Sequence, residues 1–360
     1  EDSKLILDAN IKRLISIAKY DWDSYEESWD FRLLALLNPN YYQTSLKSSY
    51  KNLRAHWRDI TLEMKKLEEE NNLIYIGAYG LQNELMIEVP INEVTLICNP
   101  HYRYGKERND GEHESQLLAD TISEFILYSV GCMFGRYSLD KEGLILANQD
   151  DTLEEYLKQV PSPSFMPDDD NVIPMIDFDG DWFEDDISER FKQFLKVTFG
   201  EDNFAENLTF VEEALGKDIK KYFAKDFYAD HVKRYKKRPI YWLFSSPKGT
   251  FNALIYMHRY RPDTVSVVLN DYLREFRTKL QARKESYEQI EISASTSQKD
   301  KTQAIKAIDK INKVLEEVND YERDILYPLA GQNIEIDLDD GVKHNYPLFG
   351  NALKKIVGLS

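Results

Sequence analysis

The clearest hydrophobic pattern lies in the N-terminal part of the chain and predicts two helices. Apolar residues share one helix face over residues 3–19. Over residues 46–67 they recur at spacings of four and three, which is typical of a long helix packed along a buried seam. The seam consists of Leu46, Tyr50, Leu53, Trp57, Ile60, Met64 and Leu67. We expect this helix to end near Asn71 and Asn72, so that residues 1–72 form a helical spacer.

Residues 73–262 combine strand-like and helical patterns. The short runs 85–90 and 93–100 predict strands, whereas residues 115–130 predict a helix. Three further helices are expected, over residues 185–198, 203–215 and 217–235. This mixture predicts an α/β domain with small sheets.

The end of this domain carries a predicted β-hairpin. Two β-rich runs, residues 239–245 and 250–258, flank a Ser-Pro-Lys-Gly turn. Residues 160–186, in contrast, lack periodicity and are rich in Pro and Asp. We interpret them as a solvated acidic loop inserted into the domain.

The C-terminal part returns to a helical pattern. Apolar stripes over residues 265–280 and 304–325 are separated by a polar joint, which predicts an antiparallel helical hairpin at 263–328. The tail, residues 329–360, should add one short strand (IEIDL) and one short helix. The whole chain is therefore predicted to have a mostly helical α+β fold.

Composition narrows the class of protein. The chain has 360 residues, of which 42% are hydrophobic and 30% charged, as in ordinary folded proteins. It has no apolar run long enough to span a membrane and no basic-then-apolar leader at its N-terminus. Two cysteines, Cys98 and Cys132, cannot build a disulfide framework, so we expect a reducing, cytoplasmic setting.

The net charge of −17 argues against nucleic-acid binding only if the charges are evenly spread. Residues 231–262, which we call the basic island, contain eight Lys and Arg residues and no Asp or Glu. Such a local excess of positive charge can attract phosphate even in an acidic protein.

Motifs for catalysis or metal binding are missing from the sequence. No glycine-rich nucleotide turn is present, and Gly131 and Gly135 enclose a Cys-Met-Phe run that does not resemble one. The tetrapeptide Asn99-Pro100-His101-Tyr102 lacks the second proline of the Asn-Pro-Pro-Tyr motif of amino-methylating DNA methyltransferases. Six histidines show no zinc-ligand spacing. We therefore predict no catalytic residue, no metal and no cofactor in this chain.

The basic island suggests a DNA-binding hairpin. Its cations can neutralise phosphates, and its serines and arginines can reach base edges. The alternative is that aromatic residues such as Tyr241 and Trp242 are core and the cations merely cover the surface.

Three long segments carry a family resemblance: YKKRPIYWLFSSPKGTFNALIYMHRY (235–260), SVGCMFGRYSLDKEGLILAN (129–148) and GDWFEDDISERFKQFLKVTFG (180–200). With KYDWDSYEESWDF (19–31), they resemble the C-terminal half of the PglX/BrxX proteins, the adenine-specific DNA methyltransferases of BREX (bacteriophage exclusion) systems. The resemblance implies that the parent enzyme binds S-adenosylmethionine in another domain and methylates adenine N6. It implies for this chain a spacer and a target-recognition domain.

The resemblance and side-chain chemistry together give a set of expected DNA contacts. They are Arg103, Tyr104, Arg136, Tyr137, Lys236, Lys237, Arg238, Ser245, Ser246, Lys248, His258 and Arg259. The expected partners are double-stranded DNA, other BREX subunits and DNA-mimicking phage inhibitors, with no membrane. Two alternatives stay open: a protein-interaction scaffold with little DNA affinity, and a free-standing enzyme that binds S-adenosylmethionine.

Overall fold

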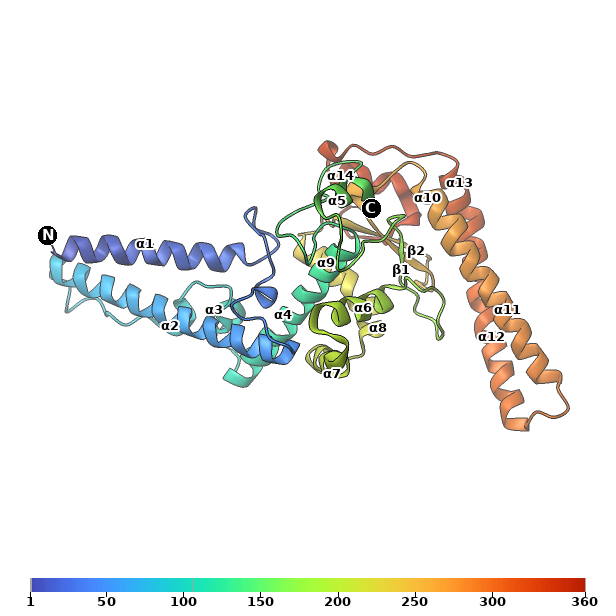
Figure 1. Cartoon of the computed structure of the whole chain (residues 1–360), viewed down its shortest axis with the longest axis horizontal. Helices are drawn as coiled ribbons and strands as arrows, with labels where there is room; N and C mark the ends of the chain where they lie inside the picture. The colour runs from blue at the N-terminus through green and yellow to red at the C-terminus, as the bar shows by residue number, and fades with distance from the viewer. Residues whose placement is uncertain (1, 106, 360) are drawn as a thin grey trace. The chain divides into compact units, whose positions relative to one another are not determined.

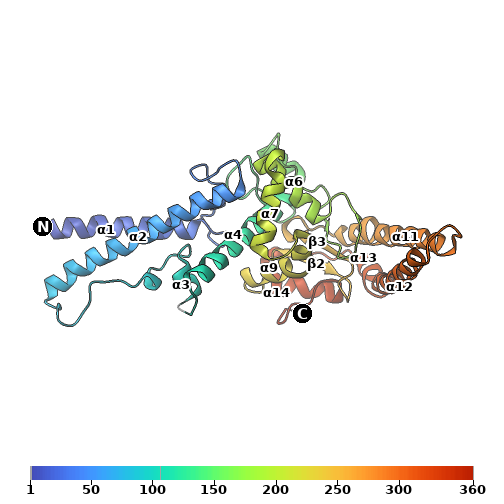
Figure 2. The ribbon, with the colours of Figure 1, turned by 90° about the horizontal axis from the view of Figure 1, so that it is seen from below.

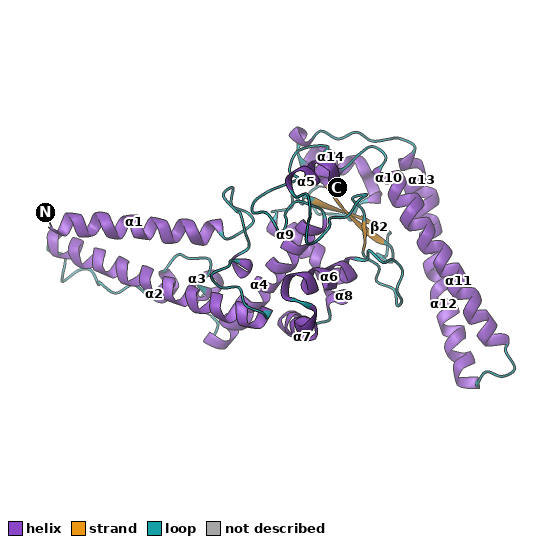
Figure 3. Cartoon of the chain, viewed as in Figure 1, coloured by secondary structure: helices purple, strands orange, loops and turns teal. Residues whose placement is uncertain are grey.

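The computed structural model describes residues 2–105 and 107–359, and helices dominate them (Figure 1, Figure 3). In this part of the chain the strands form one three-stranded sheet, which confirms the predicted mostly helical α+β fold. The chain divides into two compact units. The first comprises residues up to Tyr128 and Leu195–Gly216, and the second comprises Ser129–Phe194 and the residues from Lys217 onward.

The first unit is built on an antiparallel pair of long helices, α1 (Asp2–Asp23) and α2 (Leu46–Tyr79), which lie side by side in Figure 1. The predicted seam forms the buried side of α2, with Leu53 fully buried. Arg13 on α1 donates to Glu63 on α2 at 2.6 Å. Both predicted N-terminal helices are confirmed.

The expected end of α2 at Asn71 is wrong, because the helix continues to Tyr79 and ends at Gly80. Asn71 is buried, and its side-chain oxygen accepts a hydrogen bond from the Asn10 amide at 3.1 Å. This tertiary contact offsets the weak helix propensity of Asn. Gly80, with φ of 67°, supplies the left-handed residue that ends the helix. The predicted domain boundary at residue 72 therefore falls inside one helix.

The strands predicted at 85–90 and 93–100 are also wrong. Residues 91–93 form a 3-10 turn, η2 (Ile91–Glu93), and the following apolar residues are buried without a strand partner. The Asp21 carboxylate accepts from the amides of Ile97 (2.5 Å) and Cys98 (3.1 Å). A side chain thus satisfies the backbone groups that a neighbouring strand would otherwise bind.

Three more helices lie wholly or mostly in the first unit: α3 (Pro100–Tyr104), α4 (Asp110–Met133) and α7 (Phe204–Leu215). The amide of Leu46, at the start of α2, donates to the fully buried Asn207 on α7 at 2.8 Å. The predicted helices at 115–130 and 203–215 are confirmed.

The second unit contains the sheet, in the antiparallel order β1–β3–β2. Strands β2 (Tyr241–Ser245) and β3 (Asn252–Tyr256) form the predicted hairpin, and every residue in both is buried. The aromatic residues of the hairpin are therefore core, as the alternative interpretation of the basic island held.

The segment 160–186 is largely irregular, as predicted, but it is not a solvated loop. It contributes the edge strand β1 (Ile173–Pro174), which pairs with β3. Apolar residues such as Met175 and Trp182 are buried, and the Trp182 indole donates to the Phe178 carbonyl. Its apolar residues, and not its abundant Asp residues, decide where the segment lies.

Short helices belong largely to the second unit. They are α5 (Leu153–Gln159), α6 (Ile187–Phe199), α8 (Ile219–Tyr222), the π-turn η4 (Phe223–Phe227) and α9 (Tyr228–Arg234). The last three form one continuous helical run. Helix α6 confirms the helix predicted at 185–198, and the continuous run confirms the one predicted at 217–235.

The predicted C-terminal helical hairpin is confirmed. One arm runs through α10 (Thr264–Val267), η6 (Val268–Leu273) and α11 (Arg274–Ile292). The other runs through α12 (Gln298–Tyr321), η7 (Glu322–Leu326) and α13 (Tyr327–Ala330). Helices α11 and α12 lie side by side in Figure 1 and Figure 2.

The tail forms short helical turns, η8 (Leu338–Asp340), α14 (Val342–Asn345) and η9 (Tyr346–Ala352). The strand predicted at IEIDL is wrong, because side chains bind its backbone: the Ile334 carbonyl accepts from Tyr260 and the Ile336 carbonyl from Gln149. None of the helices in the described residues is both long and apolar enough to cross a lipid bilayer.

Candidate nucleic-acid interface

The basic island begins in α9 and continues into the turn that ends this helix. The Lys237 amide donates to the Val232 carbonyl at 2.8 Å, and the Lys236 amide donates to the Lys233 carbonyl at 3.1 Å. These two bonds form a Schellman motif, which closes the end of a helix and normally uses a left-handed glycine.

This turn places lysines where glycine would be favoured. Lys236 has φ of 50° and Lys237 has φ of 63°, and both side chains are exposed. For a residue with a Cβ, a left-handed backbone costs roughly 1–2 kcal/mol. Backbone strain of this kind is concentrated at functional sites, so two consecutive strained lysines point to a role for their charge.

A second basic segment comes from the C-terminal tail, which runs along the free edge of β2. Leu353 forms an antiparallel bridge with Phe244, and the Lys354 amide donates to the Leu243 carbonyl at 2.7 Å. The backbone of this segment is thereby fixed against the sheet. The side chains of Lys354 and Lys355 remain exposed.

The hairpin turn supplies a third basic position. Glu317 on α12 is buried and accepts from the Ser246 hydroxyl (2.6 Å), the Lys248 amide (2.7 Å) and the Thr250 hydroxyl. This carboxylate fixes the turn through backbone and hydroxyl groups. The Lys248 side chain is left exposed.

These segments border one groove of about 740 Å³, which we call the lysine groove. Its apolar lining includes Phe223, Leu243 and Ile356, all buried. Seven lysines line it: Lys225, Lys233, Lys236, Lys237, Lys248, Lys354 and Lys355. None of the lining residues is acidic. The groove is thus a concave surface with an apolar floor and a concentration of positive charge.

The charge of the lysine groove is mostly free of ion pairs. Lys225 pairs with Asp177. Within residues 2–105 and 107–359, the other six lysines form no ion pair with an acidic side chain. Unpaired lysines gathered in one groove can bind successive phosphates.

The structure brings only some of the expected DNA contacts into this groove. Lys236, Lys237 and Lys248 line it, and Arg238 is exposed but is not part of the lining. Ser245 and Ser246 are buried at the end of β2, where the Ser246 hydroxyl binds Glu317. The two serines therefore support the turn and do not face solvent.

Arg259, in the 3-10 turn η5 (Met257–Arg259) that follows β3, lies in the interior. Its guanidinium donates to the carbonyls of Phe134 (3.3 Å), Asp168 (2.8 Å) and Asp169 (3.0 Å). Only 5% of the residue is exposed. In this structure the cation holds the segment around Asp168 against the end of α4.

Arg136, Tyr137 and His258 form a separate cluster. Arg136 donates to the hydroxyls of Tyr137 (3.1 Å) and Tyr256 (3.0 Å), and Tyr137 is buried. The ring of His258 lies 4.8 Å from that of Tyr256. Burial lowers the pKa of His258 to about 4, so its ring is neutral at pH 7 and offers no positive charge to phosphate.

Arg103 and Tyr104 belong to the first unit and are held by acidic neighbours on α4. Arg103 pairs with Glu124 at 2.9 Å and Asp120 at 3.3 Å. The Tyr104 hydroxyl donates to Asp120 at 2.8 Å. Both expected contacts therefore stabilise the packing of α3 on α4.

Four groove lysines were not among the expected contacts: Lys225, Lys233, Lys354 and Lys355. Lys225 and Lys233 lie on the continuous helical run, in η4 and α9, and Lys236 follows in the turn after α9. The adjacent pair in the tail is visible in the sequence as a charge cluster, but only the tertiary pairing with β2 brings it to the groove.

The glycines at the end of α4 do not fit a cofactor cradle. A Cβ built on Gly131 would lie 2.5 Å from the Tyr137 ring, and one on Gly135 would lie 2.9 Å from Leu146. Protein side chains already occupy the space that a nucleotide would need. These residues therefore do not fit S-adenosylmethionine at this point.

Two known proteins are similar to almost the whole of this chain. No model of a known protein family matches the chain. It is 34% identical over 364 residues to the adenine-specific methyltransferase BrxX of Escherichia coli O9:H4 (strain HS), a match that covers 97% of this chain and 29% of BrxX. The chain is homologous to a segment of this methyltransferase. The resemblance noted in the sequence is thereby confirmed.

A second relative supports the same family. The adenine-specific methyltransferase PglX of Lacticaseibacillus casei (strain Zhang) is 35% identical over 348 residues, covering 92% of this chain and 27% of PglX. The chain thus spans less than a third of the length of BrxX or PglX.

Proposed function

We propose that this chain is the DNA target-recognition region of an adenine-specific N6 DNA methyltransferase that marks host DNA in a BREX phage-defence system. The observation that carries the proposal is the lysine groove, in which six lysines without acidic partners converge from three segments of the chain. Phosphate neutralisation supplies most of the non-specific affinity of DNA-binding proteins. The groove offers the charge that this interaction requires.

The homology supports a role in DNA modification. The relatives are named adenine-specific methyltransferases. An enzyme that methylates a base must hold the duplex while the base is turned out of the stack. A region that grips phosphates beside the target would serve this step.

We assign methyl transfer and S-adenosylmethionine binding to a part of the parent protein outside this chain. The sequence has no glycine-rich cofactor turn or Asn-Pro-Pro-Tyr motif, and the glycines at 131 and 135 are packed against side chains. Calorimetry with S-adenosylmethionine tests this assignment. Stoichiometric binding to the isolated chain would favour the free-standing enzyme.

The decisive experiment measures duplex binding by fluorescence anisotropy over a range of salt concentrations. The variant combines Lys233→Gln, Lys236→Gly and Lys237→Gly, which remove three unpaired charges while the glycines suit the left-handed turn. We expect affinity to fall roughly 100-fold near physiological salt, and the slope of log affinity against log salt to fall by about 0.9 per lost contact.

A matched control removes equal charge elsewhere in the second unit. Lys299→Gln, Lys306→Gln and Lys313→Gln change three exposed lysines of α12. This variant should bind DNA as the parent chain does. Equal losses in both variants would mean that only net charge matters, and no loss in either would exclude the lysine groove as the DNA-binding surface. Weak binding of DNA by the parent chain itself would favour the protein-interaction scaffold.

A further inference from the structure

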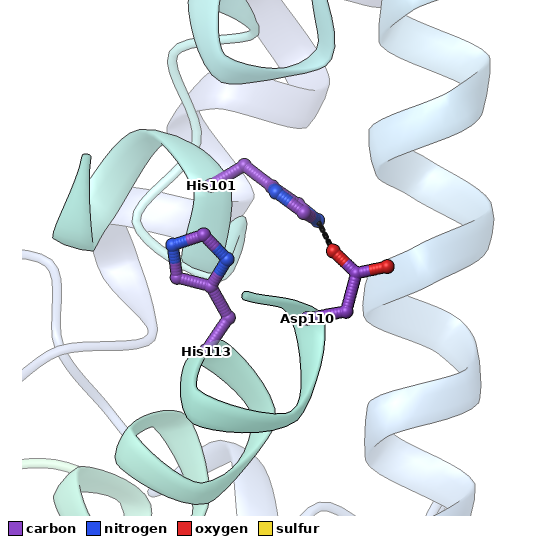
Figure 4. A group of neighbouring side chains, drawn as sticks. All are labelled: His101, Asp110 and His113. Atoms are coloured by element: carbon purple, nitrogen blue, oxygen red, sulfur yellow. Dashed lines mark ion pairs between the residues drawn. The ribbon is translucent and has the colours of Figure 1, made fainter. Parts of the chain in front are cut away.

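Two histidines and one aspartate converge in the first unit, where α3 and the start of α4 meet. His101 lies on α3, and Asp110 and His113 lie one turn apart at the start of α4 (Figure 4). One potential ligand atom from each lies within 4.8 Å of the others. The His101 Nε2 is 3.9 Å from the Asp110 carboxylate, and the two imidazole centroids are 4.6 Å apart.

His113 is the residue that points to a ligand. It is 2% exposed, and its Nε2 lies 2.8 Å from the Gly105 carbonyl oxygen. Since a carbonyl only accepts, Nε2 carries the proton and Nδ1 presents a lone pair. Nδ1 has no hydrogen-bond partner. In Figure 4 this nitrogen faces His101 and Asp110.

This arrangement is the one that metal-binding histidines adopt. Such histidines usually donate their second ring N–H to a carbonyl or carboxylate, which fixes the tautomer and aims the free nitrogen at the metal. The Gly105 carbonyl performs that task for His113. A buried nitrogen without a partner is otherwise unfavourable, and a cation would satisfy it.

We propose that His101, Asp110 and His113 bind one Zn²⁺ ion. Two imidazole nitrogens and one carboxylate oxygen are a donor set that suits zinc, and three protein ligands leave a fourth position for water. The ligand atoms must move toward one another by about 1 Å, so that each can lie roughly 2 Å from a shared zinc ion. Asp110 can make this movement because its side chain is 92% exposed.

The open position would face a pocket of about 410 Å³ that His101 and Asp110 help to line. Arg54, Arg58 and Glu114 also line this pocket, and both arginines pair with the glutamate. Bound zinc would join α3 to α4 and add a positive charge to that pocket. This inference does not depend on the lysine groove or on the proposed DNA-binding function.

The test uses the full chain, freed of metal by chelation and then titrated with Zn²⁺ by calorimetry and with Co²⁺ by visible absorption. We expect one equivalent of either ion, and an intense Co²⁺ spectrum typical of a four-coordinate site. Asp110→Asn and His101→Gln change exposed or partly exposed side chains and should each weaken binding at least tenfold. Melting temperatures without metal should stay close to that of the parent chain.

His344→Gln is the matched control. His344 lies 3.7 Å from Asp340 and forms a similar His–Asp pair, but the described residues supply no third ligand there. Its loss should leave Zn²⁺ affinity unchanged. The proposal is overturned if the parent chain binds no stoichiometric Zn²⁺ or Co²⁺, or if the two site variants bind as tightly as the control.

Discussion

The turn after α9 and the turn after β3 carry cations from the same basic island, yet the two regions differ in burial, bonding and backbone conformation. Lys236 and Lys237 are exposed, form no ion pair with a described residue and have strained left-handed backbones. Arg259 is buried and donates to three carbonyls. The guanidinium of Arg259 suits the interior, because its planar set of donors can satisfy several carbonyls at once. The ammonium groups of the lysines suit the surface, because they remain hydrated there.

The difference shows that a run of positive charge along the chain does not define a binding surface. Burial divides the basic island into groups that hold the fold together and groups that face solvent. The groove then gains charge from Lys354 and Lys355, more than 90 residues beyond the island.

Arg259→Gln should destabilise the fold by about 3 kcal/mol, because buried carbonyls lose their donors. Urea unfolding at pH 7 measures the loss. Arg238→Gln, a cation of the same island that is exposed, should change stability by less than about 0.5 kcal/mol. Similar stability changes in the two variants would abolish the distinction between interior and surface cations.

Combined Lys354→Gln and Lys355→Gln should lower DNA affinity roughly tenfold near physiological salt, through the loss of two phosphate contacts. Anisotropy with a fixed duplex measures the change. Lys306→Gln with Lys313→Gln on α12 is the control of equal charge. If the tail variant binds like this control, the interface is confined to the basic island and does not extend across the groove.

The buried ring of His231 makes the stability of the fold depend on pH. Burial lowers the pKa of His231 to about 3, with smaller contributions from Arg136 and Arg234, so the folded state resists protonation of this ring. Its contribution to stability is present above pH 6.5 and is lost as the pH falls from there toward 3. The slope for one histidine is at most about 1.4 kcal/mol per pH unit.

Urea unfolding of the parent chain and His231→Gln between pH 4.5 and 7.5 isolates this contribution. The comparison is needed because buried Asp168, whose pKa burial and Asp170 raise to about 8, acts in the opposite direction. Its stabilisation is present at low pH and is lost as the pH rises toward 8. Parallel curves for the two proteins would contradict the prediction for His231.

The smallest effect concerns the helix-ending turn. Lys236→Gly should stabilise the fold by about 1 kcal/mol, since glycine adopts the left-handed backbone without strain. The same change should weaken DNA binding a few-fold. Thermal unfolding and anisotropy on one sample measure both. A loss of stability would show that the Lys236 side chain makes contacts that support the fold.

The sequence pattern predicted elements whose stability is local or amphipathic. The seam from Leu46 to Leu67, the β2–β3 hairpin and the helical hairpin were all correct. It failed where tertiary contacts replace local preferences. Asn71 is helical because Asn10 binds it, and residues 93–100 need no strand partner because Asp21 binds their backbone.

The candidate interface was predictable in part for the same reason. The charge run identified Lys236, Lys237 and Lys248, which share the groove. It could not separate them from Arg259, because the burial of Arg259 depends on how the turn after β3 packs against Phe134 and Asp168. Pairing of the tail with β2 is a long-range event that no local pattern encodes.

Glu317 connects two parts of the second unit that would otherwise be independent. It belongs to α12, yet its carboxylate holds the β2–β3 turn through Ser246 and Lys248. A partner protein that bound the helical hairpin and displaced α12 would therefore also displace the turn that carries the Lys248 ammonium. Movement at the helical hairpin would in this way change the position of a charge that lines the lysine groove.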